Sequence, residues 1–375
     1  MKENDAVKIA MFGHKRLSRE GGVEIVVKEL CTRMAKKGHE ITCYNRSGRH
    51  VSGVQHKKIK YDGVRQIYVP TIEKKGLAAV SASFFAAIAS SFGKYDVVHI
   101  HAEGPAFFSF LPRLFGKRVI VTIHGLDWQR EKWQSGFGSK FIRQGEKNAV
   151  KYAHEIIVLS KGVQEYFWKT YGRMTRFIPN GVNRPEICPP WLITEKYGLT
   201  KDSYLLFLGR LVPEKGLRYL MEAYQQVHTE KKLVIAGGTS DTDSFVKEMR
   251  NMAKDDERII FTGFVQGQLL EELYSNAYMY CLPSDLEGMP LSLLEAMSYG
   301  NACLVSDIPE CTEVVEDKAM IFKKADIADL RDHIQKACDC PEIVKKLKNE
   351  AADFICKKYS WEQVVGETLD LYQAK

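Results

Sequence analysis

The sequence predicts an α/β protein of two doubly wound domains, whose mostly parallel sheets face each other across a cleft. Three observations support this prediction. The chain has 375 residues, which exceeds the size at which a single hydrophobic core usually stops growing. Short apolar runs rich in β-branched residues alternate with longer helical patterns through both halves. Hydrophobic residues make up 45% of the chain, which is typical of a packed globular protein.

The first half contains four apolar runs that we predict to be strands, at residues 7–12, 96–101, 118–124 and 155–160. An amphipathic pattern over residues 21–38 lies between the first two and predicts a helix that covers the sheet. Gly38 closes this pattern at the position where a glycine commonly ends a helix. Strands separated by helices in this way indicate parallel pairing.

Residues 77–92 form an uncharged segment that we predict to be a packed amphipathic helix. The segment is too short to cross a bilayer, since about 20 apolar residues are needed to span the hydrocarbon. Lys74, Lys75 and Lys94 flank it. The sequence therefore leaves open a helix that also rests on a membrane surface.

The second half repeats the alternation, with predicted strands at residues 204–209, 232–238, 259–264, 277–283 and 301–306. Residues 183–201 separate the halves, because they combine three prolines with polar residues and show no strand pattern. We therefore predict one domain over residues 1–185 and another over residues 186–359. A closing helix over about 360–375, anchored by Trp361, is expected to pack back on the first domain. Ligands of such folds bind outside the carboxyl ends of the strands.

The net charge of +7 allows anionic partners, and a solvated basic surface explains it equally well. Nucleic-acid binding has no recognition motif or aromatic and basic stripe to support it. The N-terminus carries early acidic residues and no long apolar run, so we expect a cytoplasmic protein without a secretory signal. Nine scattered cysteines without a CxxC pair indicate reduced, mostly buried thiols.

The stretch GRLVPEKG follows a predicted strand and places Arg210 and Lys215 on the loop at its carboxyl end. Arginine offers a planar fork to phosphate oxygens and lysine a mobile point charge, so the pair suits a diphosphate. A solvated basic loop is the alternative. In the first half, Gly21 and Gly22 precede a helix, where exposed N–H groups favour an anion. Ordinary turn chemistry would also explain these glycines.

The stretch EGMPLSLLE holds two carboxylates, Glu287 and Glu295, around a helix that we expect to start near Pro290. Glu287 then lies on the loop before the helix and Glu295 in its second turn, a placement that would allow both to face the mouth of the cleft. Carboxylates accept pairs of hydroxyl hydrogen bonds, which is how sugars are commonly held. Helix solvation and capping are the alternative interpretation.

Taken in order, GGVEIVVKEL, VTIHG, IPNGV, GRLVPEKG, AGG, FTGFV and EGMPLSLLE resemble the motifs of retaining family 4 glycosyltransferases of GT-B fold. The resemblance covers nearly the whole chain. It implies a nucleotide-diphosphate sugar as donor, bound by the second domain, with no metal and no other cofactor. It also implies transfer of a hexose with retained configuration, without a covalent nucleophile.

The resemblance assigns roles to individual residues. Arg210 and Lys215 would neutralise the diphosphate, aided by the backbone at Gly21 and Gly22. The donor sugar and nucleotide would be held by Glu287, Gly288, Met289, Pro290, Glu295, Phe264 and Val265. Among these, Glu295 would hold the ribose, and Phe264 and Val265 would frame the base. His124 would approach the transferred sugar, and Asp127 with Trp128 would contact the acceptor.

The stretch over residues 101–133 is similar to bacterial transferases that build capsule, exopolysaccharide or O-antigen. This similarity implies a sugar or lipid-linked sugar acceptor, reached from the cytoplasm or peripherally at the inner face of the membrane. The chain departs from the common pattern at Asn301, Ala302 and Cys303 and around Glu310, which affects the expected donor specificity. A nucleotide-sugar epimerase of similar fold and a non-catalytic nucleotide-sugar-binding subunit of an assembly complex are the competing hypotheses.

Three further features have a plainer interpretation. His99 and His101 share one face of a strand, which could suggest a metal, but strand-end packing is the preferred interpretation. Asp241 and Asp243 form a D-x-D sequence that we interpret as a turn and a helix cap. The basic run over residues 56–60 is interpreted as a solvated edge.

Overall fold

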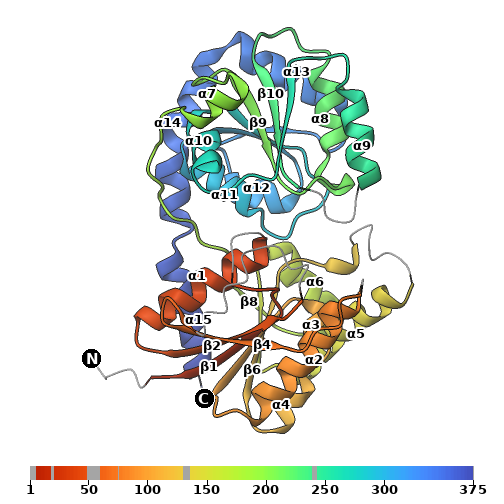
Figure 1. The fold of residues 1–375 in the computed structure, drawn as a ribbon, viewed down its shortest axis with the longest axis vertical. Coiled ribbons are helices and arrows are strands. Elements are labelled where there is room, and N and C mark those ends of the chain that lie inside the picture. The colour runs from red at the N-terminus through yellow and green to blue at the C-terminus, as the bar shows by residue number, and fades with distance from the viewer. Residues whose placement is uncertain are drawn as a thin grey trace. The chain divides into compact units, whose positions relative to one another are not determined.

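The computed structural model describes residues 6–17, 21–48, 60–74, 76–129, 136–238 and 243–374. The chain divides into two compact units (Figure 1). Unit 1 combines Met1–Asn180 with Trp361–Lys375, and unit 2 is Gly181–Ser360. Each unit has helices around one mostly parallel sheet, which confirms the predicted class of two doubly wound α/β domains.

The sheet of unit 1 has eight strands: β1 (Lys8–Phe12), β2 (Glu40–Arg46), β3 (Lys60–Tyr61), β4 (Val64–Val69), β5 (Val97–His101), β6 (Arg118–Ile123), β7 (Glu155–Val158) and β8 (Arg176–Phe177). Their order across the sheet is β3-β4-β2-β1-β5-β6-β7-β8. The pairings are parallel except for β3 with β4. The central strands are buried and rich in valine and isoleucine, as a sheet covered on both faces requires.

Helices of unit 1 are α1 (Gly22–Lys36), α2 (Leu77–Phe92), α3 (Glu103–Ala106), α4 (Phe110–Leu114), α5 (Gly136–Tyr152), α6 (Lys161–Tyr171) and α15 (Trp361–Gln373), with a short 3₁₀ turn η1 (Asp127–Gln129). The helix predicted before Gly38 is confirmed, and Gly38 has a φ of +92°. The closing helix is also present. Trp361 is buried and anchors it in unit 1, although the end of the chain is far from this unit in sequence.

Helix α2 has the predicted bounds, but its packing differs from that of an ordinary amphipathic helix. Its buried residues are alanines and serines, while Leu77, Phe84, Phe85 and Phe92 are exposed. Among the residues that the structure describes, no helix is both long enough and apolar enough to span a membrane.

The sheet of unit 2 has six strands: β9 (Tyr204–Leu208), β10 (Lys232–Ala236), β11 (Ile259–Gly263), β12 (Met279–Leu282), β13 (Ala302–Ser306) and β14 (Met320–Phe322). Their order is β11-β10-β9-β12-β13-β14, and the pairings are parallel. The surrounding helices are α7 (Leu192–Tyr197), α8 (Leu217–Tyr224), α9 (Asp243–Met252), α10 (Gln268–Asn276), α11 (Leu291–Ser298), α12 (Pro309–Val315), α13 (Ile327–Asp339) and α14 (Pro341–Lys358), with a 3₁₀ turn η3 (Pro213–Lys215). Helix α7 lies in the segment that sequence reasoning treated as a linker.

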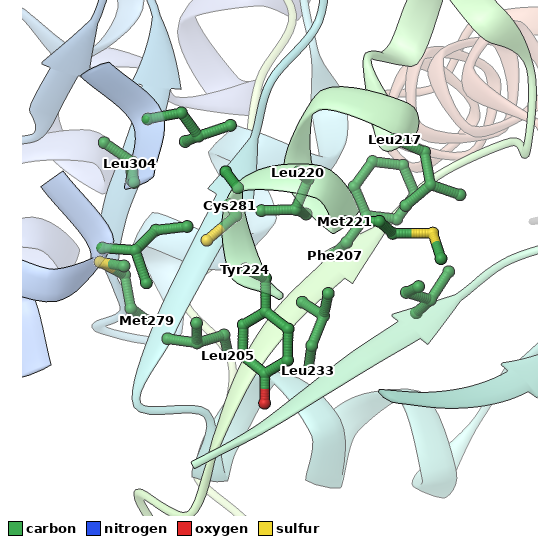
Figure 2. Packing of buried hydrophobic residues seen from close by; sticks show 14 of the residues in the cluster. Leu205, Phe207, Leu217, Leu220, Met221, Tyr224, Leu233, Met279, Cys281 and Leu304 are labelled. Atoms are coloured by element: carbon green, nitrogen blue, oxygen red, sulfur yellow. The ribbon is translucent and has the colours of Figure 1, made fainter. Parts of the chain in front are cut away.

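The core of unit 2 joins the strands to α8 (Figure 2). Side chains from β9, β10, β12 and β13 meet Leu217, Leu220, Met221 and Tyr224 of that helix. Burying each such side chain contributes about 1.5–3 kcal/mol. The Tyr224 hydroxyl donates to the Lys231 carbonyl oxygen at 2.6 Å, so the core contains the ring without leaving its polar group unpaired. This packing fixes where β9 ends and α8 begins, and the candidate site lies between those two points.

Candidate functional site

Both sheets have a point where the strand order changes direction. In unit 1 this point is between β1 and β5, and in unit 2 it is between β9 and β12. Loops that leave the carboxyl ends of two such strands diverge to opposite faces of the sheet, which opens a place for a ligand. The residues predicted for the site follow these strands or their neighbours in each unit.

Two glycines bring the loops of unit 2 together. Gly216 has a φ of +67°, and a Cβ atom there would lie 1.9 Å from the carbonyl oxygen of Pro283. A Cβ atom at Gly237 would lie 1.8 Å from the carbonyl oxygen of Gly209. Since no side chain fits at either place, these glycines allow the loop after β9 to touch the loops after β10 and β12.

Lys215 and Glu287 meet at this place. The Nζ of Lys215 lies 2.5 Å from Oε1 of Glu287, and their side chains are 13% and 8% exposed. The Ser284 hydroxyl donates to the same oxygen at 2.6 Å. Ser306 in turn donates to the Ser284 carbonyl oxygen at 2.6 Å. The structure therefore brings a predicted cation and a predicted carboxylate into one mostly buried pair, held by a serine network.

Arg210 stands on the same loop as Lys215, with its side chain exposed. The backbone on both sides of it is anchored to the end of β10, because Gly209 N–H donates to Ala236 at 3.0 Å and Leu211 N–H to Gly238 at 3.1 Å. The guanidinium is thus carried by a fixed backbone at the carboxyl end of the central strand. This position agrees with the placement predicted from GRLVPEKG.

Glu295 lies in the second turn of α11, which begins at Leu291, directly after Pro290. The Tyr274 hydroxyl donates to Oε2 of Glu295 at 3.2 Å. Burial raises the pKa of Tyr274 well above its usual value, so this hydroxyl remains a donor. Gly288, Met289 and Pro290 are buried between Glu287 and the helix.

Phe264 and Val265 follow β11. The Phe264 ring is more than half exposed, while Val265 is buried. A Cβ atom at Gly238 would lie 3.5 Å from Cβ of Phe264, so the phenylalanine stands beside the end of β10. An exposed aromatic ring at this end of the sheet offers a flat apolar surface.

In unit 1, Gly21 precedes α1 and Gly22 is its first residue. The carboxylate of Glu24 reaches back toward them, since a Cβ atom on Gly21 would lie 2.2 Å from its Oε2. Oε1 of Glu24 accepts the Lys15 N–H at 2.9 Å. The start of α1 thus has an internal carboxylate that ties it to the loop after β1, a contact that sequence reasoning missed.

His124 directly follows β6, and its Nε2 lies 3.1 Å from Nδ1 of His101 at the end of β5. Burial lowers the pKa of His101 well below its usual value, and the neighbouring His99 and His124 act in the same direction. One ring nitrogen of this pair donates and the other accepts, because His101 stays neutral. Nε2 of His101 is buried and has no hydrogen-bond partner among the described residues.

The packing interpretation fits both histidines, because His101 is fully buried and its ring stacks on that of His99, with the centroids 4.2 Å apart. His99 is buried and contacts Tyr372 at 2.6 Å and Thr122 at 2.7 Å, which satisfies both ring nitrogens. His101 also contacts His124, a predicted site residue, at 3.1 Å. Asp241 and nearly all of the basic run at 56–60 lie outside the described residues, and α9 begins at Asp243.

Two buried glutamates hold the loop after His124. The Asp127 N–H donates to Oε2 of Glu103 at 2.8 Å, and Nε1 of Trp128 donates to Oε2 of Glu146 at 3.2 Å. Burial raises the pKa of Glu103 well above its usual value, and the charges of Asp127 and Glu146 add to this effect.

Glu146 also accepts hydrogen bonds from Tyr166, at 2.9 Å, and from Tyr171. Both tyrosines belong to α6, so this carboxylate joins α5 and α6 to the loop of Trp128. Sequence reasoning found Asp127 and Trp128 but missed both glutamates. The available signal was Glu103 itself, a charged residue two positions after a buried strand.

Within the described ranges, no group of three or more His, Cys, Asp or Glu side chains is arranged to hold a metal ion. The described residues offer charged and polar side chains held at fixed positions. Unit 2 presents two cations and two carboxylates near the ends of β9 and β12, and unit 1 presents the hydrogen-bonded pair of His101 and His124. Such groups can stabilise a polyanion and orient hydroxyl groups.

Comparison with known proteins places both units among transferases. A model described as Glycosyltransferase Family 4 matches residues 20–184, and one described as Glycosyl transferases group 1 matches residues 191–354. An uncharacterized glycosyltransferase of Methanocaldococcus jannaschii is 26% identical over 298 residues, with 75% of each chain covered. The O-antigen chain mannosyltransferase B of Escherichia coli is 27% identical over 193 residues, or 50% of each chain.

A solved structure supports the fold. The Anabaena protein HepE, in complex with UDP and glucose, has a TM-score of 0.81 over 97% of this chain and 98% of its own. The two sequences are 14% identical, so the likeness concerns the fold alone.

Proposed function

This chain belongs to the family 4 glycosyltransferases of GT-B fold, and we propose that it transfers a hexose from a nucleotide-diphosphate sugar to a sugar or lipid-linked sugar. The transfer would proceed with retained anomeric configuration. The observation that carries the proposal is the Lys215–Glu287 pair at the carboxyl ends of β9 and β12, supported by Ser284. A donor of this kind needs both a cation for its diphosphate and a carboxylate for its sugar hydroxyls.

The assigned roles fit the positions of the side chains in unit 2. Arg210 and Lys215 neutralise the diphosphate as it leaves. Glu287 accepts hydroxyl hydrogen bonds from the donor sugar, and Ser284 keeps this carboxylate in place when Lys215 turns toward a phosphate. Glu295, oriented by Tyr274, accepts from the ribose.

The remaining assignments extend the proposal. The base would lie against Phe264 and Val265, and the backbone of Gly288, Met289 and Pro290 would frame the sugar. In unit 1, the backbone at Gly21 and Gly22 would assist the phosphates, His124 would approach the transferred sugar, and Asp127 with Trp128 would contact the acceptor. Each of these sets belongs to a loop at the carboxyl edge of its sheet.

We propose a metal-independent reaction without a covalent nucleophile. The charge that develops on the departing diphosphate would be stabilised by Arg210 and Lys215, and the transferred sugar would pass directly to the acceptor. His124, held by His101, would contribute a positioned hydrogen bond.

A role in surface polysaccharide synthesis is the proposed biological setting. The partial match to an O-antigen mannosyltransferase supports it, as does the similarity of residues 101–133 to transferases that build such polymers. The protein would act in the cytoplasm or peripherally at the inner face of the membrane, where a lipid-linked acceptor is reached.

The test is a thermal-shift and product-release screen against UDP-, GDP-, ADP- and dTDP-sugars, with and without EDTA. We expect one donor to stabilise the protein and to be hydrolysed slowly in EDTA. Glu287→Ala should lower this turnover about 100-fold or more. Glu248→Ala is the matched control, because Glu248 forms an exposed ion pair with Arg218 elsewhere in unit 2.

Each alternative outcome has a distinct meaning. No response to any nucleotide sugar would overturn the proposal. Donor binding without transfer to any acceptor would indicate the non-catalytic subunit, and conversion of the sugar into its epimer would indicate the epimerase. Equal loss of turnover in both variants would mean that Glu287 acts only through stability.

A further inference from the structure

Helix α2 of unit 1 has the reverse of the usual polarity. Its buried face consists of Ser81, Ala82, Ser83, Ala86, Ala87, Ser90 and Ser91. Its exposed large side chains are Leu77, Phe84, Phe85 and Phe92, which fall on one side of a helix with 3.6 residues per turn. A surface helix in water normally buries its large apolar residues and exposes polar ones. The outward face of α2 is therefore built for an environment other than water.

The serines of α2 do not need water either. The hydroxyls of Ser83 and Ser91 donate to the carbonyl oxygens of Ala79, at 2.7 Å, and of Ala87, at 2.6 Å, within the helix. Ser81 donates to the Leu77 carbonyl oxygen at 2.8 Å. Because the helix carries no charged residue, its outer surface is a continuous apolar stripe.

The apolar stripe continues onto α4, which lies beside α2 (Figure 1). The rings of Phe92 and Phe115 are 4.5 Å apart, and Phe92 and Leu114 are 70% and 73% exposed. Lys117 donates to the carbonyl oxygens of Gly93, at 2.7 Å, and Tyr95, at 3.1 Å, which fixes the end of α4 against the end of α2. We call this surface the α2–α4 patch; it consists of Leu77, Phe84, Phe85, Phe92, Leu114 and Phe115.

Cations lie at both ends of the patch. Lys74 precedes α2, Lys94 follows it, and Arg113 belongs to α4, and all three side chains are exposed. The acidic neighbours are Glu73, beside Lys74, and Asp96, which accepts the Lys8 N–H at 2.8 Å. An apolar stripe with basic residues at its ends is the pattern of a helix that lies in the interface of an anionic membrane.

We propose that the α2–α4 patch docks on the surface of an anionic lipid bilayer. Its phenylalanine and leucine side chains would enter the boundary between head groups and acyl chains, and the three cations would contact lipid phosphates. This inference rests on the proposed function in one respect, because it gives the membrane contact of the transferase a defined location. Its evidence, however, comes only from the packing of α2 and α4.

The test is flotation of the full-length protein with vesicles of phosphatidylcholine, alone or mixed with phosphatidylglycerol. We expect binding to the mixed vesicles and release at high salt. The double variant Phe92→Gln with Leu114→Gln should lower the partition coefficient about tenfold or more. Trp168→Gln with Met174→Gln is the matched control, because these residues are 58% and 76% exposed in unit 1 outside the patch.

Lys94→Glu with Arg113→Glu should abolish the preference for phosphatidylglycerol. The proposal is overturned if the wild type does not bind vesicles, or if the patch and control variants bind equally. It is also overturned if sedimentation shows a lipid-free dimer that Phe92→Gln with Leu114→Gln dissociates, since the patch would then join two copies. Donor hydrolysis without vesicles, measured on the same variants, tests the proposed function separately: a protein without hydrolysis can still float, and one that does not float can still hydrolyse.

Discussion

At the scale of single residues, the site depends on charges removed from water. Lys215 and Glu287 are mostly buried, and the serine network satisfies the carboxylate further. Breaking such a pair by removing one partner costs more than the pair contributes, because the other charge is left buried.

Glu103 is a buried carboxyl group that avoids an unpaired charge by keeping its proton. It is fully buried, and its raised pKa keeps it protonated where an exposed glutamate would be ionised.

The raised pKa of Glu103 predicts how stability depends on pH. Above pH 4.5 the unfolded state loses this proton while the folded state keeps it. Unfolding then releases a proton, so the free energy of unfolding falls as pH rises, by up to about 1.4 kcal/mol per pH unit. The contribution is fully present below pH 4.5 and is lost as the pH rises toward the folded-state pKa.

Glu103→Gln should remove this pH dependence, so the free energy of unfolding of the variant should rise relative to that of the wild type as the pH increases above 4.5. Denaturant unfolding at several pH values measures the difference. Glu165→Gln is the control, because Glu165 is exposed and paired with Lys169 on α6. Parallel curves for Glu103→Gln and wild type would contradict the assignment.

At the scale of elements, the loops of unit 2 are shaped by backbone contacts that exclude side chains. Gly216 ends η3 and begins α8, and the Pro283 carbonyl oxygen fills the space where a Cβ atom would be. This contact places Lys215 beside the loop that carries Glu287. Tyr280 adds a further tie, because its hydroxyl donates to Ser292 at 2.8 Å and so joins β12 to α11.

Gly216→Ala is predicted to destabilise unit 2 and to reduce donor turnover. Gly198→Ala is the matched control, because Gly198 has a similar φ of +63° and only Lys232 Nζ lies near its Cβ position, at 4.0 Å. Both variants pay about 1–2 kcal/mol for the left-handed backbone. The contact with Pro283 should add roughly 1–3 kcal/mol for Gly216→Ala alone. Equal unfolding midpoints in urea would show that the close approach carries no cost.

At the scale of the whole molecule, unit 1 is completed by a segment that follows unit 2 in sequence. Tyr372 of α15 contacts His99 at 2.6 Å, and Arg118 of β6 donates to the Leu371 carbonyl oxygen at 2.8 Å. Trp361, Val365 and Leu369 are also buried there. The chain therefore cannot complete its first unit until its last helix is present.

Removal of residues 361–375 is predicted to unfold unit 1 while unit 2 stays folded. The lost side chains contribute about 1.5–3 kcal/mol each, and their sum reaches the whole stability of a typical domain, about 5–15 kcal/mol. Hydrogen exchange should show β1 and β6 unprotected and β9 and β13 protected. A chain ending at Gln373 is the control. Protection of β1 and β6 in the longer truncation would contradict the prediction.

The sequence by itself determined the fold class, because apolar runs and helical patterns repeat with a period that only a covered parallel sheet satisfies. It located β1, β5, β6, β7 and the five main strands of unit 2. It did not locate β2 and β4, whose runs Glu40–Arg46 and Val64–Val69 mix polar with apolar residues, or the short strands β3, β8 and β14. It also identified Lys215 and Glu287 as candidates, since each follows a buried strand.

Only the tertiary structure decided which of these residues meet. The Lys215–Glu287 contact spans 72 positions and depends on β9 and β12 pairing in the sheet. The His101–His124 contact depends likewise on the pairing of β5 with β6. The outward face of α2 was also decided by the tertiary structure, because its sequence carries no charged residue to mark a solvent side and only packing decides which side is buried. The sequence pattern indicates the local preference of each segment for helix or strand. Which distant residues come into contact, and which side chains are buried, is determined only when the segments pack together.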